Sequence, residues 1–188
     1  MNKSSFPKSF CSVDASTASI AFSFFIEGEL RQYGKLSFSG SGIYEKIADA
    51  ARKTQSIFNV IPTECMVIEK TIFANSPQVA ANLALSQGAL IAGATMSGVK
   101  SIYSVAPISW QSYIGNPLIK KDEKEFIRSS NPGKSTAWYK AKEREIRKNR
   151  TIDIVNNKYS IQVLDNDVAD AIGIGMFSLD NWHKIVGS

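Results

Sequence analysis

Residues 10–39 of the chain read FCSVDASTASIAFSFFIEGELRQYGKLSFS, and they decide the fold because they contain three consecutive strand-forming runs. The runs cover residues 10–14, 19–26 and 30–39, and each is rich in aromatic and β-branched residues. Glu-Gly-Glu at positions 27–29 separates the second run from the third, as a hairpin turn would. The stretch therefore predicts a three-stranded antiparallel meander.

The segments that follow alternate between helical and strand patterns. Apolar residues recur with a helical period over 43–58, and they fill almost the whole of 77–97. Residues 65–68 and 99–108 read as strands, and the first of these is uninterruptedly apolar, which is typical of a central strand buried on both faces. This order predicts an α/β protein with a mixed five-stranded sheet, three antiparallel strands plus two parallel, flanked by helices.

The rest of the chain supplies a loop and two further helices. Periodicity disappears over 116–135, where Pro, Gly, Ser, Asn and Lys dominate, so a long, mobile, basic loop is predicted. A basic helix is expected over 136–157, and an apolar, glycine-containing helix over 168–179. Residues 1–9 are polar and are predicted to be frayed. Length and composition predict a single domain over 1–188.

The composition argues against chemistry that relies on histidine or on paired cysteines. Cys11 and Cys65 are the only cysteines and have no CxxC spacing, so neither a disulfide framework nor a zinc site is expected. His183 is the only histidine and is expected at the surface, which argues against a Ser-His or Cys-His nucleophile system. Because no leader peptide is evident, a reducing cytosol is the expected compartment.

Positive charge is concentrated in one segment. Residues 115–150 contain eleven Lys or Arg and five Asp or Glu, a net charge of +6, so the overall charge of +5 leaves −1 for the remainder. Clustered Lys and Arg suit a polyanion such as nucleic acid. The alternative is a solvated helix face with internal ion pairs, which Glu143 and Glu145 would support.

The apolar helix over 77–97 carries small residues at four-residue spacing. Asn82, Ser86 and Gln87 interrupt its apolar surface and argue against a membrane span. A stripe of small residues permits close backbone approach, either to the sheet of the same subunit or to a second copy of the chain. The stripe consists of Ala80, Ala84, Gly88 and Ala92.

Four acids stand where strands end or a helix begins. Asp14 lies in the first strand and Glu69 directly follows the apolar strand, while Asp167 and Asp170 begin the last helix. Ligand sites in open α/β sheets lie at the carboxyl ends of the strands. Four carboxylates gathered there would repel one another unless divalent cations neutralised them, and oxygen ligands favour Mg²⁺ or Mn²⁺. Two such ions support in-line phosphoryl displacement without histidine.

A simpler interpretation of these acids exists. Asp167 can cap the last helix with Asp170 at its third position, because a helix N-terminus stabilises negative charge without any metal. Asp14 can point to solvent, as strand acids often do. Asp165 can also replace Asp167 as a ligand in a shifted register.

Two motifs resemble those of the RuvC family of Holliday junction resolvases, which have the RNase H-like fold. Residues 68–75, IEKTIFAN, followed by LSQG at 85–88, are similar to the family's second acidic motif. Residues 167–175, DVADAIGIG, resemble its closing D-x-x-D-A motif. Asp14 is not followed by the usual Asp-x-Gly turn, and the loop over 115–135 is longer than in the bacterial enzymes. The resemblance therefore points to a phage-type or divergent member.

The resemblance implies a homodimeric endonuclease that resolves four-way junctions and other branched DNA and leaves 5′-phosphate ends. It implies two Mg²⁺ ions per active site, for which Mn²⁺ can substitute, and the cytoplasm of a bacterial or phage-infected cell. The implied catalytic and metal-binding residues are Asp14, Glu69, Asp167 and Asp170. The implied DNA-binding residues are Lys70, Phe73, Lys134, Lys140, Lys142, Arg144 and Lys148. The small-residue stripe is the expected dimer interface.

Two alternatives remain open from the sequence. One is an RNase H-fold nuclease that acts on RNA or on flap and replication intermediates without junction selectivity. The other is a catalytically silent module that only binds branched DNA.

Overall fold

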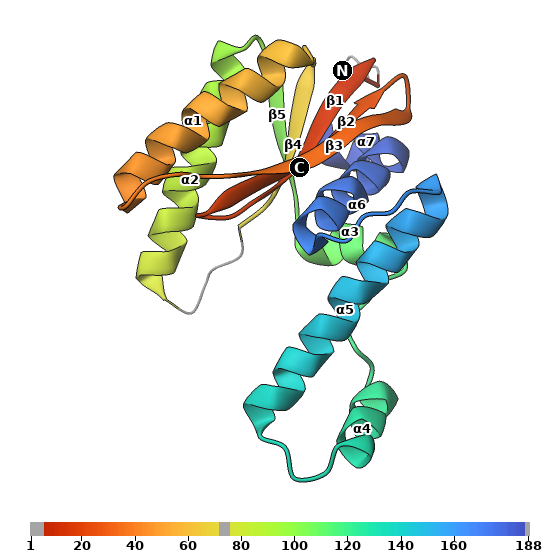
Figure 1. Ribbon diagram of the computed structural model, residues 1–188. Coiled ribbons are helices and arrows are strands. Elements are labelled where there is room, and N and C mark those ends of the chain that lie inside the picture. The colour runs from red at the N-terminus through yellow and green to blue at the C-terminus, as the bar shows by residue number, and fades with distance from the viewer. Residues whose placement is uncertain (1–5, 72–75, 187–188) are drawn as a thin grey trace.

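A mixed five-stranded sheet forms the centre of the computed structural model, which describes residues 6–71 and 76–186 (Figure 1). The strand order is β3-β2-β1-β4-β5; β1 to β3 are antiparallel, whereas β4 pairs in parallel with both β1 and β5. The predicted sheet of three antiparallel plus two parallel strands is thus confirmed. The strands are β1 (Ser9–Ala15), β2 (Ser19–Ile26), β3 (Glu29–Ser37), β4 (Cys65–Glu69) and β5 (Ser101–Val105).

The hairpin between β2 and β3 has the turn that the sequence predicts. Glu27 and Gly28 both have positive φ, 51° and 82°, as the two central residues of a type I′ turn require. Ile26 and Glu29 pair on either side of them. This turn fixes the pairing of the first residues of β3, and a one-residue register shift between Phe24 and Phe25 sets the pairing of the rest.

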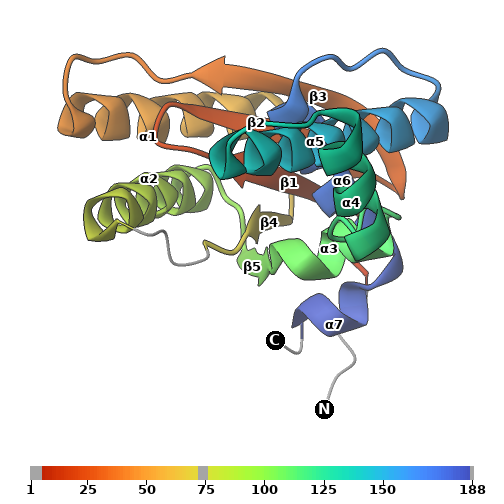
Figure 2. The same cartoon turned by 90° about the horizontal axis from the view of Figure 1, so that it is seen from below.

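Helices cover both faces of the sheet, which explains why β2 is buried along almost its whole length (Figures 1 and 2). Helices α1 (Ile43–Val60) and α2 (Pro77–Met96) pack on one face. The other face carries α6 (Asn166–Asp180), with the shorter α3 (Pro107–Tyr113) and α7 (Trp182–Val186) beside it.

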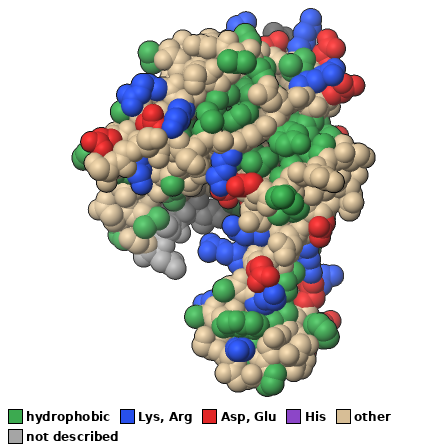
Figure 3. Space-filling model, viewed as in Figure 1, with side chains coloured by type: hydrophobic (Ala, Val, Ile, Leu, Met, Phe, Trp, Pro, Cys, Tyr) green, Lys and Arg blue, Asp and Glu red, His purple; other side chains and the backbone are tan. Residues whose placement is uncertain are grey.

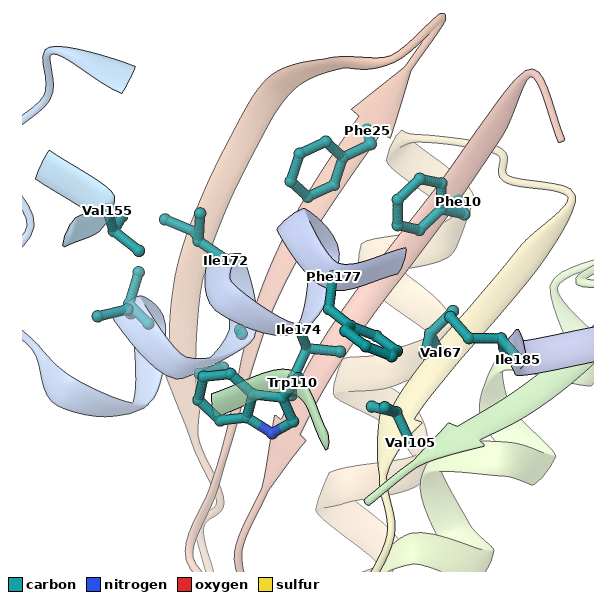
Figure 4. Close-up of a cluster of buried hydrophobic side chains, with 14 of the residues drawn as sticks. Phe10, Phe25, Val67, Val105, Trp110, Val155, Ile172, Ile174, Phe177 and Ile185 are labelled. Atoms are coloured by element: carbon teal, nitrogen blue, oxygen red, sulfur yellow. The ribbon is translucent and has the colours of Figure 1, made fainter. Parts of the chain in front are cut away.

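Side chains alternate between the two faces along the central strands, and both faces are buried, so each face has its own apolar cluster. On the α6 face, Phe10 and Val67 pack with Trp110 and Phe177 (Figure 4). On the α1 and α2 face, neighbouring residues such as Met66 pack inward instead. The parity of a strand residue therefore decides which set of helices it meets.

Two glycines let α6 approach its neighbours closely. A Cβ atom at Gly173 would lie 2.7 Å from the ring of Trp110, and one at Gly175 would lie 2.0 Å from the ring of Phe25. Neither position has room for a side chain. The glycine-containing run of the last helix therefore serves its contact with the sheet and with α3.

Three expectations about chain segments are wrong. Residues 116–135 are not one loop, because they contain α4 (Lys121–Ser130). The helix begins where the Lys120 amide donates to Glu123 (2.9 Å), and Ile127 is buried. Residues 6–9 are not frayed, since Phe6 packs on Phe10 and Trp182 and β1 begins at Ser9.

The third correction concerns the segment around Pro107. The strand predicted over 99–108 is shorter than expected, because Pro107 starts α3 and β5 ends at Val105. Pro is well suited to the first turn of a helix, where its missing N–H has no partner to lose. Trp110 of this helix then reaches the core.

Helices α4 and α5 (Thr136–Tyr159) extend away from the sheet as an arm (Figure 1). The C-terminal end of α5 packs against α6, and Val155 there belongs to the core cluster. We call α4, α5 and the residues that connect them the α4–α5 arm.

The small-residue stripe of α2 does not face the sheet of its own subunit. Ala84, Gly88 and Ala92 are exposed, whereas α2 contacts α1 through residues such as Leu90 and Gly93. Of the two alternatives, packing of the stripe on the sheet is therefore wrong. By length and composition alone, α2 could cross a membrane, a test that core helices of soluble proteins also pass.

Candidate active site

Asp14 and Glu69 occupy equivalent positions at the ends of adjacent parallel strands. Val13 of β1 pairs with Ile68 of β4, so the two acids are the next residues in register. Side chains alternate between the two faces along a strand, so both acids face α6. Ser12, two residues before Asp14, lies on this face and bonds to Ser23. Both acids line one pocket of about 330 Å³ and are half-buried, so the expectation that Asp14 points to solvent is wrong.

The environment of Asp14 opposes its negative charge. The pKa of Asp14 is raised to about 8, and burial is the largest cause. The negative charges of Glu69, Asp170 and Asp167 contribute in the same direction. Lys148 on α5 acts against them. The other three acids singled out in the sequence therefore act electrostatically on Asp14.

Glu69 is held in place by its neighbours. Its Oε2 atom accepts a hydrogen bond from Trp110 Nε1 (2.7 Å), and its backbone carbonyl accepts one from Gln87 Nε2 (3.0 Å). Burial raises the pKa of the Glu69 carboxyl, while the bond from Trp110 acts in the opposite direction. Trp110 was not identified from the sequence as part of the site, whereas Gln87 belongs to the LSQG segment that resembles the second acidic motif.

Asp170 lies in the second turn of α6 and completes the group. Burial and then the charge of Glu69 raise the pKa of Asp170 to about 7. A hydrogen bond from Thr151 and the charge of Lys148 lower it in part. Because Thr151 and Lys148 both belong to α5, the α4–α5 arm contributes directly to the environment of this acid.

The start of α6 differs from the predicted cap. The N-cap is Asp165, not Asp167, because Asp165 Oδ1 accepts from the amides of Asp167 (2.9 Å) and Val168 (3.2 Å). Lys35 Nζ lies 2.9 Å from Asp165 Oδ2 and 2.6 Å from Asp167 Oδ2. Asp165 therefore caps the helix and pairs with Lys35. Asp167 also pairs with Lys35, and its negative charge acts on Asp14.

The register of the sheet explains the position of Lys35. Asp14 pairs with Ala21, and Ala21 pairs with Lys35, so the three residues form one row across the sheet on the α6 face. Ala21 is small and fully buried under α6. Lys35 can therefore reach the first turn of this helix from β3.

The donor set fits a hard divalent cation in its chemistry. Within residues 6–71 and 76–186, no three His, Cys, Asp or Glu side chains are placed closely enough to hold a metal ion as they stand. The other acids are nevertheless near enough to raise the pKa of Asp14, and both Glu69 and Asp167 raise the pKa of Asp170. Only oxygen ligands are present. A divalent cation among Asp14, Glu69 and Asp170 would neutralise this repulsion.

A second, larger pocket adjoins the carboxylates at the base of the α4–α5 arm, and we call it the arm pocket. Its volume is about 560 Å³, and it lies between α3 and the arm. Asp170 lines it, while Pro107 and Arg144 line both pockets. Further lining residues include Ile108, Gln111, Asn116, Leu118, Lys140, Arg147 and Lys148.

The structure gathers part of the predicted DNA-binding set around these pockets. Lys70 lies beside Glu69, and Lys140, Arg144 and Lys148 line the arm pocket. Figure 3 shows Lys and Arg side chains where the arm leaves the body.

The other predicted DNA-binding residues are elsewhere. Lys142 pairs with Glu145 (2.9 Å), as the ion-pair alternative expects, and Lys134 lies 5.8 Å from the ring of Trp138 at the start of α5. Phe73 lies outside the described residues. His183 is exposed, as predicted.

Several solved structures of Holliday junction resolvases are similar to this fold. Thermus thermophilus RuvC is 13% identical over 94% of this chain and 97% of its own, with a TM-score of 0.65. The same protein in complex with a Holliday junction substrate is 12% identical over 92% and 96%, also at 0.65. The yeast mitochondrial Holliday junction resolvase is 14% identical over 93% and 79%, at 0.50.

No protein-family model matches the chain, and no curated protein matches it in sequence. The shared fold covers almost the whole of both chains in the RuvC comparisons, although identity is low. The expected resemblance is therefore confirmed in three dimensions. The chain has the RNase H-like α/β fold of RuvC and is similar in structure to the Holliday junction resolvases.

Proposed function

We propose that the protein is a homodimeric endonuclease that resolves four-way DNA junctions and related branched DNA. The observation that carries this proposal is the group of half-buried acids on a RuvC-like sheet, beside a basic pocket. Asp14 and Glu69 come from adjacent parallel strands, and Asp170 comes from the helix that covers them. An isolated cap or a solvent-facing strand acid would not bring these three together.

The proposed chemistry is phosphodiester hydrolysis that leaves 5′-phosphate and 3′-hydroxyl ends. Asp14, Glu69 and Asp170, with Asp167 at the edge of the group, would hold two Mg²⁺ ions, or Mn²⁺ in their place. Bound ions would supply the positive charge that the attacking and leaving oxygens need. The chain itself orients Glu69 through Trp110 and keeps the acids in a half-buried position.

The basic residues around the site provide the affinity for a polyanion. Lys140, Arg144 and Lys148 line the arm pocket next to Asp170, and Lys70 extends the positive surface beyond Glu69. Contacts of this kind fix the position of the phosphate backbone and carry no sequence information. Lys134 and Lys142 lie further along α5 and would contribute to the same field.

We place the dimer interface on the exposed face of α2. The small-residue stripe is flanked there by the exposed side chains of Val79, Leu85 and Ile91, an apolar surface of the kind that a second copy would cover. A dimer would offer two active sites for the two cuts that junction resolution requires. The cytoplasm of a bacterial or phage-infected cell remains the proposed location.

The interface has its own test. Ala84→Arg places a charge in the centre of the stripe, whereas Asn59→Arg places one on the exposed surface of α1. Sedimentation should find a dimer for the wild type and for Asn59→Arg, and a monomer for Ala84→Arg. A wild-type monomer at micromolar concentration, both with and without junction DNA, contradicts this part of the proposal.

A cleavage panel tests the function itself. The substrates are a four-way junction, a flap, a linear duplex and a structured RNA, each with Mg²⁺. We expect the four-way junction to be cut fastest, at symmetric positions. Equal rates on linear duplex would exclude a resolvase, and preference for RNA or flaps would favour the alternative nuclease. Binding without any cleavage would favour the silent module.

A further inference from the structure

Asn116 and Thr151 form a buried polar pair between the segment after α3 and helix α5. Each of the two residues is only 1% exposed. Asn116 Nδ2 donates to the backbone carbonyl of Arg147 (2.7 Å) and to Thr151 Oγ1 (2.9 Å). Both residues belong to the wall of the arm pocket, as does Asp170. The pair therefore lies beside one of the proposed metal ligands.

The carbonyl of Arg147 fixes the orientation of the Asn116 amide. A backbone carbonyl can only accept a hydrogen bond, so the amide presents its NH₂ group to it and not its oxygen. The second proton of the same NH₂ group is then directed to Thr151 Oγ1. The hydroxyl of Thr151 is therefore the acceptor in its bond with Asn116.

The hydroxyl of Thr151 has one proton of its own and two acceptors for it among the described residues. The first acceptor is the Arg147 carbonyl, at 3.4 Å, which is long for a hydrogen bond from a hydroxyl. This carbonyl also accepts from Asn116. The second acceptor is the side chain of Asp170, to which Thr151 is hydrogen-bonded. A charged acceptor makes the stronger bond, so the proton is directed to Asp170.

Packing alone does not explain an asparagine at position 116. Its Oδ1 atom is buried and has no hydrogen-bond partner in the part of the chain that the structure describes. A buried polar atom without a partner destabilises the fold, and an apolar side chain would avoid this loss. An apolar side chain could not supply the two bonds that Nδ2 donates. One of them ties α5 to the segment after α3, and the other sets the direction of the Thr151 hydroxyl.

We infer that Asn116 and Thr151 are positioning residues that hold the Asp170 carboxylate in the orientation in which it binds a divalent cation. This inference rests on the proposed function and deepens it. Carboxylates that bind metal ions are themselves hydrogen-bonded, and the loss of such a partner lowers metal affinity by about 10- to 100-fold. Because Thr151 belongs to α5, its hydroxyl also links the orientation of Asp170 to the position of the α4–α5 arm.

Substitutions at position 151 separate the hydroxyl from the rest of the side chain. Thr151→Val keeps the shape of the side chain and removes the hydroxyl. Thr151→Ser and Thr151→Ala both lose the methyl group and differ only in the hydroxyl, so they repeat the comparison if valine is not accommodated. Thr54→Val is the matched control, because Thr54 is fully buried in α1 and its hydroxyl donates to the Ala50 carbonyl (2.7 Å).

The first measurement is the Mn²⁺ affinity of the whole protein, determined by calorimetry without DNA. We expect the dissociation constant to rise about tenfold in Thr151→Val and Thr151→Ala, and less than about twofold in Thr151→Ser and Thr54→Val. Junction binding without divalent ions should stay within about twofold of the wild type in all four variants, since the bond acts on Asp170 and not on DNA. Cleavage at subsaturating Mg²⁺ should fall only in the two variants that lack the Thr151 hydroxyl.

A double-mutant cycle tests Asn116. Asn116→Leu removes both donated bonds and should weaken Mn²⁺ binding a few-fold in the wild type. In Thr151→Val the same substitution should have almost no further effect, because Asn116 acts on Asp170 through the Thr151 hydroxyl. Asn116→Ala gives the same cycle if leucine is not accommodated. Additive losses of Mn²⁺ affinity would contradict the role assigned to Asn116.

The outcomes separate the two proposals. If the wild type binds Mn²⁺ and cuts four-way junctions, but Thr151→Val and Thr151→Ala do both as well as Thr151→Ser, the positioning inference is wrong and the resolvase proposal stands. Equal losses in Thr54→Val and Thr151→Val also overturn the inference, because any buried hydroxyl would then have this effect. If Mn²⁺ affinity follows the Thr151 hydroxyl but no branched DNA is cut, the proposed function is wrong and the positioning inference stands.

Discussion

The ammonium group of Lys35 lies 2.6 Å from Oδ2 of Asp167 and 2.9 Å from Oδ2 of Asp165, so β3 is tied to the first turn of α6. Burial lowers the pKa of Lys35, but the hydrogen bonds to Asp167 and Asp165 outweigh it and the pKa lies above its ordinary value. The contact with Asp167 is made through its Oδ2 atom. Lys35 therefore orients an acid at the edge of the proposed metal site.

Replacement of Lys35 by methionine should weaken both the helix start and the site. We expect a loss of about 1 kcal/mol in the free energy of unfolding, because the pair is partly exposed. Mn²⁺ affinity, measured by calorimetry, should fall about tenfold as Asp167 loses its fixed orientation. Lys100→Met removes an exposed lysine that has no such role and serves as the control. Tighter Mn²⁺ binding by Lys35→Met would show that Lys35 only repels the ion.

The stability of the metal-free protein should depend on pH through the buried acids. The folded-state pKa values of Asp14 and Asp170 are about 8 and about 7, above the ordinary value for Asp. The folded state therefore binds protons more tightly than the unfolded state. Tighter proton binding by Asp14 and Asp170 stabilises the folded state. This contribution is fully present below about pH 4 and is lost as pH rises through 7 and 8.

Thermal unfolding at pH 5 and pH 8 measures this effect. We expect the metal-free wild type to lose on the order of a few kcal/mol between these values, and Asp14→Asn to lose much less. Mg²⁺ should restore most of the stability at pH 8, since a cation replaces the protons. An Asp14→Asn protein with the same pH dependence as the wild type would show that Asp14 does not titrate in this range.

The hydrogen bond from Trp110 to Glu69 can be removed with little change in shape. Trp110→Phe keeps most of the buried ring and loses the Nε1 donor. Cleavage should fall between about tenfold and 100-fold, because the partners that orient a ligand contribute effects of this size. Trp182→Phe, at a buried tryptophan away from the carboxylates, controls for packing. Equal losses in both variants would mean that the hydrogen bond has no specific role.

Gly175 tests the close approach of α6 to the sheet. A Cβ atom there would lie 2.0 Å from the Phe25 ring and 2.7 Å from Ser12 Oγ, and both neighbours are buried. Gly175→Ala should therefore destabilise the protein by about 3 kcal/mol, at the upper end of the usual cost of overpacking. Urea denaturation measures this loss. Wild-type stability would mean that the helix can shift away from Phe25 without cost.

The sequence was sufficient for the order of the five strands and of the four longest helices, α1, α2, α5 and α6. Strand patterns and the turn at 27–29 predict the meander, and the position of Glu69 after an apolar strand predicts its place at the sheet edge. The side of the sheet on which Asp14 lies follows only from strand parity and from the identity of the helices on each face. Only the folded structure shows which helices lie on which face.

Other features depend on contacts between distant segments. Helix α4 was missed because it is short and strongly polar, and only Ile127 is buried. Its local signals are the bond from Lys120 to Glu123 and a Lys121–Glu125 ion pair. Lys35 reaches α6 through the register of three strands. Asn116, in the segment after α3, bonds to Arg147 and Thr151 of α5. The contacts of Lys35 and Asn116 have no local sequence signature.

The most direct test of the central claim is cleavage of a four-way junction by Asp170→Asn in the presence of Mg²⁺. Asp153→Asn, at an exposed position of α5, is the matched control. We predict that the wild type and Asp153→Asn cut the junction, whereas Asp170→Asn binds it with similar affinity and cuts at least 100-fold more slowly. Cleavage by Asp170→Asn at the wild-type rate would contradict the assignment of these acids as the catalytic site.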